Sequence, residues 1–355
     1  MKRLLTIADR ATLLSLKLLC AANILFVISF LVIVALATGR ARAEMPACTG
    51  HDMMAEMQKS DPAGLAAIRV EADKTLNGKG LLWKVAKDGR TSYLFGTMHL
   101  TDPRVTKLTP AARKAFDASD TVVIETTDVL DKARMMAALM AKPELTMFTD
   151  ATTLTSLLPQ GEVASVNKAL DARGIPPASV IKMKPWILSA MLALPACEVA
   201  RQSAGAPVLD VKLADDAKAA GKSVEGLETA VSQLEAMASL PMDFHVRGLV
   251  DALRLGSRID DVIETMIALY VKGDTGTFWP LFKAALPSEG QDEAGYAAFE
   301  ETMIKTRNKT MVKRAEPIFQ RSNAFMAVGA LHLPGPEGLI ELFRKDGYTV
   351  TVADL

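Results

Sequence analysis

The feature that most constrains this sequence is a motif that occurs twice, near its two ends. Residues 92–100 form an apolar strand pattern followed by a glycine, two further residues and a histidine. Residues 324–333 repeat this order, again with a histidine three positions after the glycine. Matched apolar strands at the two ends of a chain need each other to form a buried sheet. We therefore expect the strands that end at Phe95 and Val328 to be close neighbours in one sheet.

Strand and turn signals around these motifs indicate an α/β fold. An Asp-Gly turn separates the first two apolar stretches and predicts a β-hairpin. From about residue 130 to residue 322 the pattern is almost wholly helical and contains no low-complexity linker. We expect a split mixed sheet formed by strands from both chain ends, with residues 130–322 as a helical insertion within one domain of residues 44–355. The expected strands are 81–85, 92–95, 121–125, 324–329 and 348–352, with a short strand possible at 222–227.

Residues 1–43 resemble a targeting segment. A basic start leads into an apolar run from Leu18 to Ala37, and small residues follow at Ala41 and Ala43, as signal peptidase requires. The run of about 20 residues is also long enough to span a bilayer, so a signal peptide and a retained N-terminal anchor are both open. Either way we expect an exported protein, periplasmic or anchored facing the periplasm. It would contact a membrane only through this segment.

Two cysteines, Cys48 and Cys197, lie beyond the targeting segment. An even pair in an oxidising compartment is a candidate disulfide. The alternative is two buried free thiols.

Charge argues against a nucleic-acid partner. The formal net charge is +0 over the whole chain, and it becomes mildly acidic once the basic N-terminal segment is removed. No long basic run remains, whereas binding to phosphates needs a basic face.

The two motif histidines, His99 and His332, are the main candidates for chemistry in a chain with four histidines. A strand-end glycine (Gly96 or Gly329) lets the backbone turn tightly or approach a ligand closely. Each histidine is then presented at the rim of the sheet, where ligand sites of α/β proteins collect. Two imidazoles and a carboxylate are a common ligand set for a catalytic divalent metal, and Glu125 closes the third strand. The alternative is that each strand-end histidine is merely hydrogen-bonded.

A shared metal sets a geometric expectation. Ligand bonds of about 2.1 Å bring coordinating nitrogens roughly 3 to 4 Å apart, and we allow about 10 Å between the imidazoles without metal. Both rings and the Glu125 carboxylate should face a common cleft, with Asp210 as the substitute carboxylate. Asp210 also suits a helix N-cap, Glu228 a first helical turn, and the pair Arg307-Asn308 a solvated helix face. No Gly-x-Ser-x-Gly elbow and no His-Glu-x-x-His helix occurs, which argues against serine hydrolases and zincins.

Several segments, in order and spacing, resemble the TraB/GumN/Tiki family. The resemblance covers the chain from about Cys48 to the C-terminus, including its bacterial GumN-like branch. The first signature corresponds to residues 82–99, the acidic strand to 123–125 and the closing signature to 327–335. The other matching segments are 185–186, 195–198, 209–210, 226–229 and 307–308.

This resemblance implies an EreA/ChaN-like split α/β fold and a hydrolase site. The animal Tiki branch is described as a metal-dependent protease that favours manganese or cobalt over zinc, and GumN-type members are linked to exopolysaccharide gene clusters. By motif, His99 and His332 are implied to be metal ligands or catalytic histidines, and Glu125 a ligand or general base. The residues implied to line or support the site are Arg307, Asn308, Asp210, Glu228, Gly96 and Gly329.

Two interpretations of function follow. The leading one is an exported metal-dependent hydrolase acting on peptide bonds, with a peptide or an envelope polymer as substrate. The second is a non-catalytic accessory or binding protein in envelope or exopolysaccharide assembly that retains the site. Whether the protein is an enzyme is therefore open, and loss of turnover on replacing His99 would decide it.

Overall fold

A computed structural model of the protein describes residues 48–285 and 293–353. The targeting segment, residues 1–43, lies outside this described part, so cleavage and anchoring stay predictions. No helix within the described part is long and apolar enough to cross a membrane.

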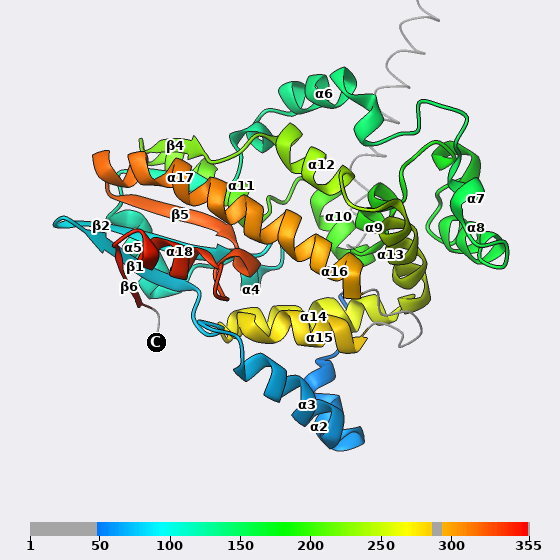
Figure 1. The fold of residues 1–355 in the computed structure, drawn as a ribbon, viewed down its shortest axis with the longest axis horizontal. Helices are drawn as coiled ribbons and strands as arrows, with labels where there is room; N and C mark the ends of the chain where they lie inside the picture. Colours follow the sequence, from blue (N-terminus) through cyan, green and yellow to red (C-terminus); the bar gives the residue numbers. More distant parts are fainter. Residues whose placement is uncertain (1–47, 286–292, 354–355) are drawn as a thin grey trace, which may run out of the picture. The chain divides into compact units, whose positions relative to one another are not determined.

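A six-stranded mixed sheet carries the fold (Figure 1). Its strands are β1 (Leu82–Lys87), β2 (Arg90–Thr97), β3 (Thr121–Ile124), β4 (Ser223–Gly226), β5 (Ala324–Gly329) and β6 (Thr349–Val352). Their spatial order is β4-β3-β5-β2-β1-β6. The first four run parallel, whereas β1 is antiparallel to both β2 and β6. The expected mixed sheet built from strands of both chain ends is confirmed.

The two motif strands lie side by side, as expected. β2 and β5 pair in parallel, with Phe95 opposite Ala327 and Gly96 opposite Val328. Nearly every residue of β5 is buried, because helices cover both faces of the sheet. A strand buried on both faces reads as a continuous apolar run rather than an alternating one.

The hairpin between β1 and β2 follows from its turn residues. Asp88 and Gly89 have φ angles of 51° and 76°, and a two-residue turn with both φ positive is the type I′ turn that Asp-Gly favours. Residues Lys87 and Arg90 pair directly across it. This local chemistry sets the register of the hairpin.

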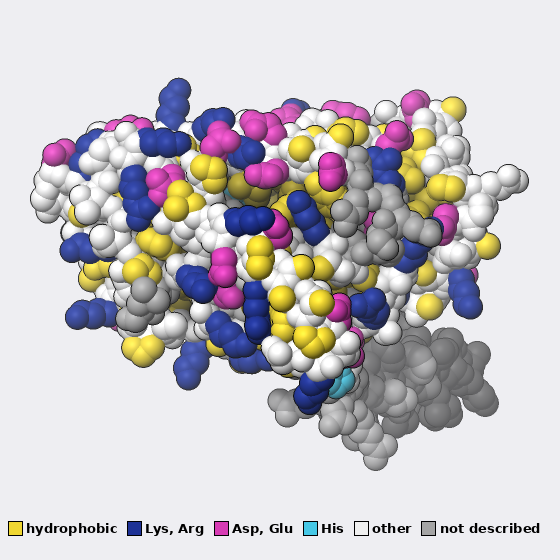
Figure 2. All heavy atoms as spheres, turned by 60° about the horizontal axis from the view of Figure 1, so that its bottom comes forward, with side chains coloured by type: hydrophobic (Ala, Val, Ile, Leu, Met, Phe, Trp, Pro, Cys, Tyr) yellow, Lys and Arg dark blue, Asp and Glu magenta, His cyan; other side chains and the backbone are white. Residues whose placement is uncertain are grey.

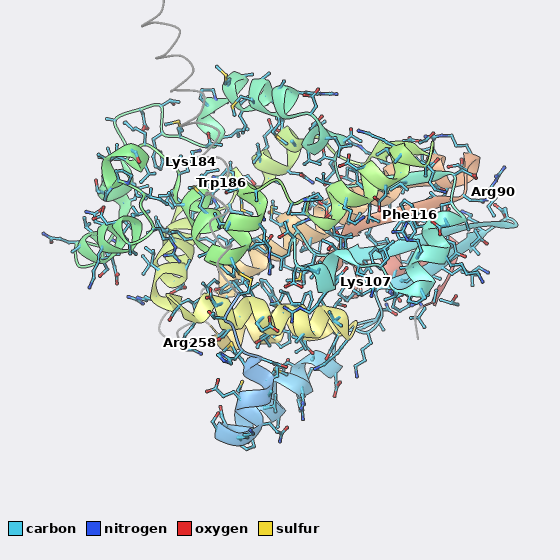
Figure 3. All side chains as sticks on the ribbon, turned by 180° about the vertical axis from the view of Figure 1, so that it is seen from behind. Arg90, Lys107, Phe116, Lys184, Trp186 and Arg258 are labelled. Carbon is cyan, nitrogen blue, oxygen red and sulfur yellow. A yellow bond between two sulfur atoms is a disulfide. The ribbon has the colours of Figure 1, made fainter. Side chains whose placement is uncertain are left out.

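Helices pack on both faces of the sheet. Phe116, labelled in Figure 3, lies edge-on to Phe325 of β5 with ring centroids 5.6 Å apart. The helices are α2 (Met53–Ser60), α3 (Pro62–Asp73), α4 (Pro103–Thr106), α5 (Pro110–Asp117), α6 (Lys132–Ala141), α7 (Leu154–Leu157), α8 (Val163–Asp171), α9 (Pro185–Leu192), α10 (Ala196–Ser203), α11 (Leu209–Ala219), α12 (Ala230–Ala238), α13 (Met242–Leu255), α14 (Arg258–Val271), α15 (Phe278–Ala285), α16 (Glu293–Phe299), α17 (Thr306–Arg321) and α18 (Leu339–Lys345). One face packs against α5, α11 and α14, and the other against α17 and α18. A separate apolar cluster joins α8, α9 and α13.

A disulfide joins the start of the described chain to α10. Cys48 and Cys197 are bonded, with their Cα atoms 5.3 Å apart. The expected disulfide is confirmed, and the alternative of two free thiols is wrong.

Charges of both signs are mixed on the surface. Figure 2 shows basic and acidic side chains interleaved with apolar ones over one face. Several of these charges are paired, for example Arg104 with Glu264 and Arg254 with Glu162. The absence of a nucleic-acid partner stays a prediction.

Candidate active site

Charged and imidazole side chains follow the carboxyl ends of the four parallel strands. His99 follows β2, Glu125 follows β3 and His332 follows β5. Glu228 comes just after β4. Because these strands are neighbours and parallel, their carboxyl ends meet at one edge of the sheet. The sheet topology alone therefore brings the four side chains together.

Both motif histidines point at the same carboxylate oxygen. Nε2 of His99 lies 4.0 Å from Glu125 Oε1, and Nε2 of His332 lies 3.9 Å from that oxygen. The two nitrogens cannot be farther apart than these distances combined, which satisfies the limit of about 10 Å set from metal–ligand geometry. The His332 side chain is 5% exposed and that of His99 is 59% exposed. Solvent therefore reaches this cluster of side chains at His99.

Gly96 and Gly329 are needed for space rather than for an unusual φ angle. A Cβ added at Gly329 would lie 3.2 Å from Glu125 Oε1 and 3.8 Å from His99 Nε2. A Cβ at Gly96 would lie 3.1 Å from the Cβ of Ala330. The backbone N–H of Gly329 also donates to Glu125 Oε1 at 2.8 Å. At both positions the backbone thus lies close to other residues of the protein, and the expected approach to a ligand stays a prediction.

Asp210 holds the other nitrogen of His99. Its Oδ2 lies 2.7 Å from His99 Nδ1, and its Oδ1 accepts a hydrogen bond from Thr97 Oγ1 at 2.7 Å. The N-cap interpretation of Asp210 is wrong, because α11 is capped at Val208 and Asp210 lies inside its first turn. Its side chain turns to the sheet edge, where it accepts hydrogen bonds from groups distant in the sequence.

Asn308 holds the other nitrogen of His332. Its Oδ1 lies 2.7 Å from His332 Nδ1, while its Nδ2 donates to the backbone carbonyl of Glu337 at 2.8 Å. That donor bond orients the amide, so His332 Nδ1 carries the proton and Nε2 keeps a lone pair. The expectation of a solvated face is wrong here, because Asn308 is fully buried.

Arg307 links two buried carboxylates. Its Nη2 donates to Glu125 Oε2 at 2.6 Å and to Glu228 Oε2 at 2.7 Å. Its Nη1 donates to the backbone carbonyl of Met303 at 3.2 Å, within a π-helical segment at residues 300–305. Single π turns are frequent at functional sites. The first-turn interpretation of Glu228 is wrong, because it precedes Thr229, the N-cap of α12.

Sequence reasoning missed two residues of this group. Gln233 Nε2 donates to Glu125 Oε2 at 3.0 Å and to Glu228 Oε2 at 3.3 Å. Thr97, the last residue of β2, donates to Asp210. Gln233 carries no sequence signal, because it looks like an ordinary helix residue. Thr97 lies within the first Gly-x-x-His motif, but a threonine at a strand end does not by itself indicate a role.

The surroundings set distinct ionisation states. Burial alone would raise the pKa of Glu125, but His332, His99, Arg307 and the Gly329 N–H together lower it to about 2. Arg307 is charged throughout, so the carboxylate stays ionised even with His332 neutral. The Asp210 carboxylate, against the effect of burial, raises the pKa of His99 to about 9. Burial lowers the pKa of His332 to about 4.

The donor atoms fit a divalent cation in kind and orientation. The Nδ1 atom of each ring is hydrogen-bonded, as in metal-ligating histidines, and each Nε2 points to Glu125 Oε1. Ligand bonds of about 2.1 Å imply donor atoms roughly 3 to 4 Å apart, and the two observed distances lie at the upper end of that range. As placed, no three or more His, Cys, Asp or Glu side chains within the described residues form a metal-holding cluster. The kinds of donor atom therefore fit a divalent cation, although the described side chains as placed form no such cluster.

The sequence is similar to those of known proteins. A sequence model of the TraB/PrgY/gumN family matches residues 81–352, a span that takes in all four strand ends. The chain is 24% identical over 333 residues to "Metalloprotease TIKI2" of Danio rerio, covering 79% of this chain and 62% of the relative. It is 26% identical over 341 residues to "Metalloprotease TIKI1" of Xenopus tropicalis, covering 81% and 65%. The human "Metalloprotease TIKI1" is 25% identical over 316 residues, covering 76% and 61%. The chain thus spans less than two thirds of the length of these relatives.

Proposed function

The chain belongs to the TraB/PrgY/gumN family, and from that premise we propose that it is a metal-dependent peptidase centred on His99, His332 and Glu125. The observation that carries the proposal is the approach of both Nε2 atoms to one oxygen of Glu125. Relatives named metalloproteases support the reaction class.

A bound divalent cation would supply Lewis acidity for hydrolysis. Asp210 and Asn308 hold the rings of His99 and His332 so that both Nε2 atoms face Glu125. Arg307 keeps Glu125 ionised and fixes its Oε2, which leaves Oε1 toward the imidazoles. A carboxylate with a pKa of about 2 is a weak proton acceptor at neutral pH. Of the two roles expected for Glu125, that of ligand suits it better than that of general base.

The proposal extends to location, substrate and metal. The protein would act outside the cytoplasm, in the periplasm or anchored facing it, and its disulfide supports an oxidising compartment. The substrate would be a peptide, or a peptide within an envelope polymer. Two imidazoles and a carboxylate suit manganese, cobalt and zinc. The preference for manganese or cobalt rests on the family resemblance.

Replacing His99 by alanine tests the proposal. We expect the purified protein to bind a divalent metal and to cleave members of a peptide library, and H99A to lower turnover at least about 100-fold because a metal ligand is lost. Elemental analysis and mass-spectrometric detection of cleaved peptides give the two readouts. His51→Ala is the matched control, since that histidine is exposed. If the protein neither binds manganese, cobalt or zinc nor cleaves peptides in the presence of any of them, the peptidase proposal fails. The accessory or binding role in envelope or exopolysaccharide assembly would then remain.

Removing the carboxylate behind His99 should weaken metal binding without removing a ligand. We expect Asp210→Asn to lower metal affinity about 10- to 100-fold, the usual effect of losing a partner that orients a ligating histidine. Competitive titration with a chromogenic chelator measures it. Asp215 lies on the same helix but is exposed. The Asp215→Asn variant should therefore bind metal as the parent protein does. Equal losses in both variants would contradict a positioning role for Asp210.

A further inference from the structure

An apolar pocket of about 450 Å³ lies beside the candidate centre. It is lined by residues of α9, α13, α15 and α16, and Figure 1 shows α13 next to α9. Leu331, the residue before His332, is part of its wall. Its volume falls within the range of about 300 to 1,000 Å³ that is usual for ligand pockets. None of the chemistry proposed above uses this space.

One wall of the pocket is a set of aromatic rings that pack on each other. Trp279 stacks on Phe282 and on Phe299, each with ring centroids 5.9 Å apart. Tyr296 meets Trp279 edge-on at 5.6 Å and Phe244 edge-on at 5.7 Å. These mutual contacts hold the rings in place without a ligand. The wall is therefore ready to receive a flat apolar group.

Two polar atoms of pocket-lining residues are buried without a hydrogen-bond partner among the described residues. They are Trp186 Nε1 and His245 Nε2. Figure 3 shows Trp186 near the start of α9. The Met237 carbonyl is hydrogen-bonded to the His245 ring, so the nitrogen it faces carries the proton and Nε2 is an acceptor. Buried polar groups are nearly always paired in folded proteins, so these two atoms, one donor and one acceptor, are left for a ligand that reaches them.

A glycine in the middle of α13 borders open space at the pocket. Gly248 lines it, and a Cβ at this position would meet nothing within 4 Å. Glycine is unfavourable inside a helix because it loses more backbone entropy than other residues. Ser189, Ala190 and Ala252 are further small residues of the lining. The lining therefore combines small residues with the aromatic ones.

We propose that this pocket binds a tyrosine side chain of the peptide substrate. The aromatic ring would lie against the wall formed by Trp279 and Phe299. A phenolic hydroxyl both donates and accepts, so it can donate to His245 Nε2 and accept from Trp186 Nε1. Leu331 of the pocket wall is the residue before His332, so the pocket and the proposed reaction centre share one short chain segment. The identity of the ligand as substrate rests on the proposed peptidase function.

Binding of two matched amides tests the pocket independently of catalysis. The probes are N-acetyltyrosinamide and N-acetylphenylalaninamide, titrated by calorimetry and by the fluorescence of Trp186 and Trp279. We expect the tyrosine amide to bind at least about ten-fold tighter, because the phenylalanine amide leaves both buried polar atoms unpaired. Trp186→Phe, which keeps a ring but removes the N–H, should reduce that ratio. Equal affinity for the two amides overturns the proposal.

Two substitutions at Gly248 separate pocket filling from misfolding. Gly248→Leu should project into the open space and abolish binding, while its Tm stays at or above that of the parent because a helix glycine is lost. Gly248→Ala should raise Tm in the same way and keep most of the binding. If G248L binds the amides with the affinity of the parent protein, the amides bind outside this pocket and the proposal is overturned.

Peptide cleavage, measured beside binding, shows whether the pocket proposal or the peptidase proposal is wrong. The H99A variant should bind N-acetyltyrosinamide like the parent, because His99 does not line the pocket. Binding without any peptide cleavage contradicts the peptidase function, and with it the assignment of the ligand as substrate. Cleavage that shows no preference for tyrosine, and that G248L leaves unchanged, contradicts the pocket proposal alone.

Discussion

Replacing Cys48 and Cys197 together by alanine is expected to lower the free energy of unfolding by about 4 to 5 kcal/mol. The disulfide closes a long loop, since the two cysteines are 149 positions apart. In the chain-entropy account, such a cross-link removes many conformations from the unfolded chain, and the gain grows with the logarithm of loop length. Cys197 is also buried, so its truncation adds a small packing loss. Equilibrium unfolding in urea, followed by circular dichroism, measures the difference.

Reduction of the parent protein is the control for this experiment. The parent treated with a thiol reductant should unfold at nearly the urea concentration of the double alanine variant, because both lack the cross-link. A difference below about 1 kcal/mol between oxidised parent and variant would show that the loop is restricted by other contacts in the unfolded state.

Replacing Arg307 by methionine is expected to cost about 3 to 5 kcal/mol of unfolding free energy. The change leaves Glu125 and Glu228 adjacent and without their shared cation, with side chains only 10% and 5% exposed. Removing one partner of a buried ion pair leaves an uncompensated charge away from water. Gln233 would still donate to both carboxylates, and the Gly329 N–H to Glu125. Urea unfolding at neutral pH measures the loss.

A second arginine of the same helix provides the matched control. Arg321 pairs with Glu225 at the surface, with side chains 53% and 32% exposed. Arg321→Met should cost less than about 1 kcal/mol, since solvent screens exposed pairs. The double variant Arg307→Met, Glu228→Gln should recover part of the R307M loss because one of the two unpaired charges is gone. Equal losses of unfolding free energy in R307M and R321M would show that the protein interior tolerates the Glu125 and Glu228 carboxylates without a cation.

Much of the fold could be predicted from local patterns. The apolar runs and the Asp88-Gly89 turn specify local structure through side-chain period and backbone preference. The pairing of β2 with β5 could be predicted from the sequence. Strands that are apolar on both faces need neighbouring strands and helices that cover both faces of the sheet. The candidates His99, His332 and Glu125 followed from the same strands, because parallel strands bring their carboxyl ends to one edge.

The partners of those residues were decided only by the tertiary structure. Asp210 suited a helix cap by its local sequence, and Asn308 a solvated face. Their hydrogen bonds to His99 and His332 depend on how α11 and α17 pack against the sheet. Gln233 carried no local signal at all. Local sequence determines which residues lie at a strand end, because period and turn chemistry act over a few residues. Which helix meets that end depends on packing between segments far apart in the chain, and that packing sets the hydrogen bonds and pKa values of the site.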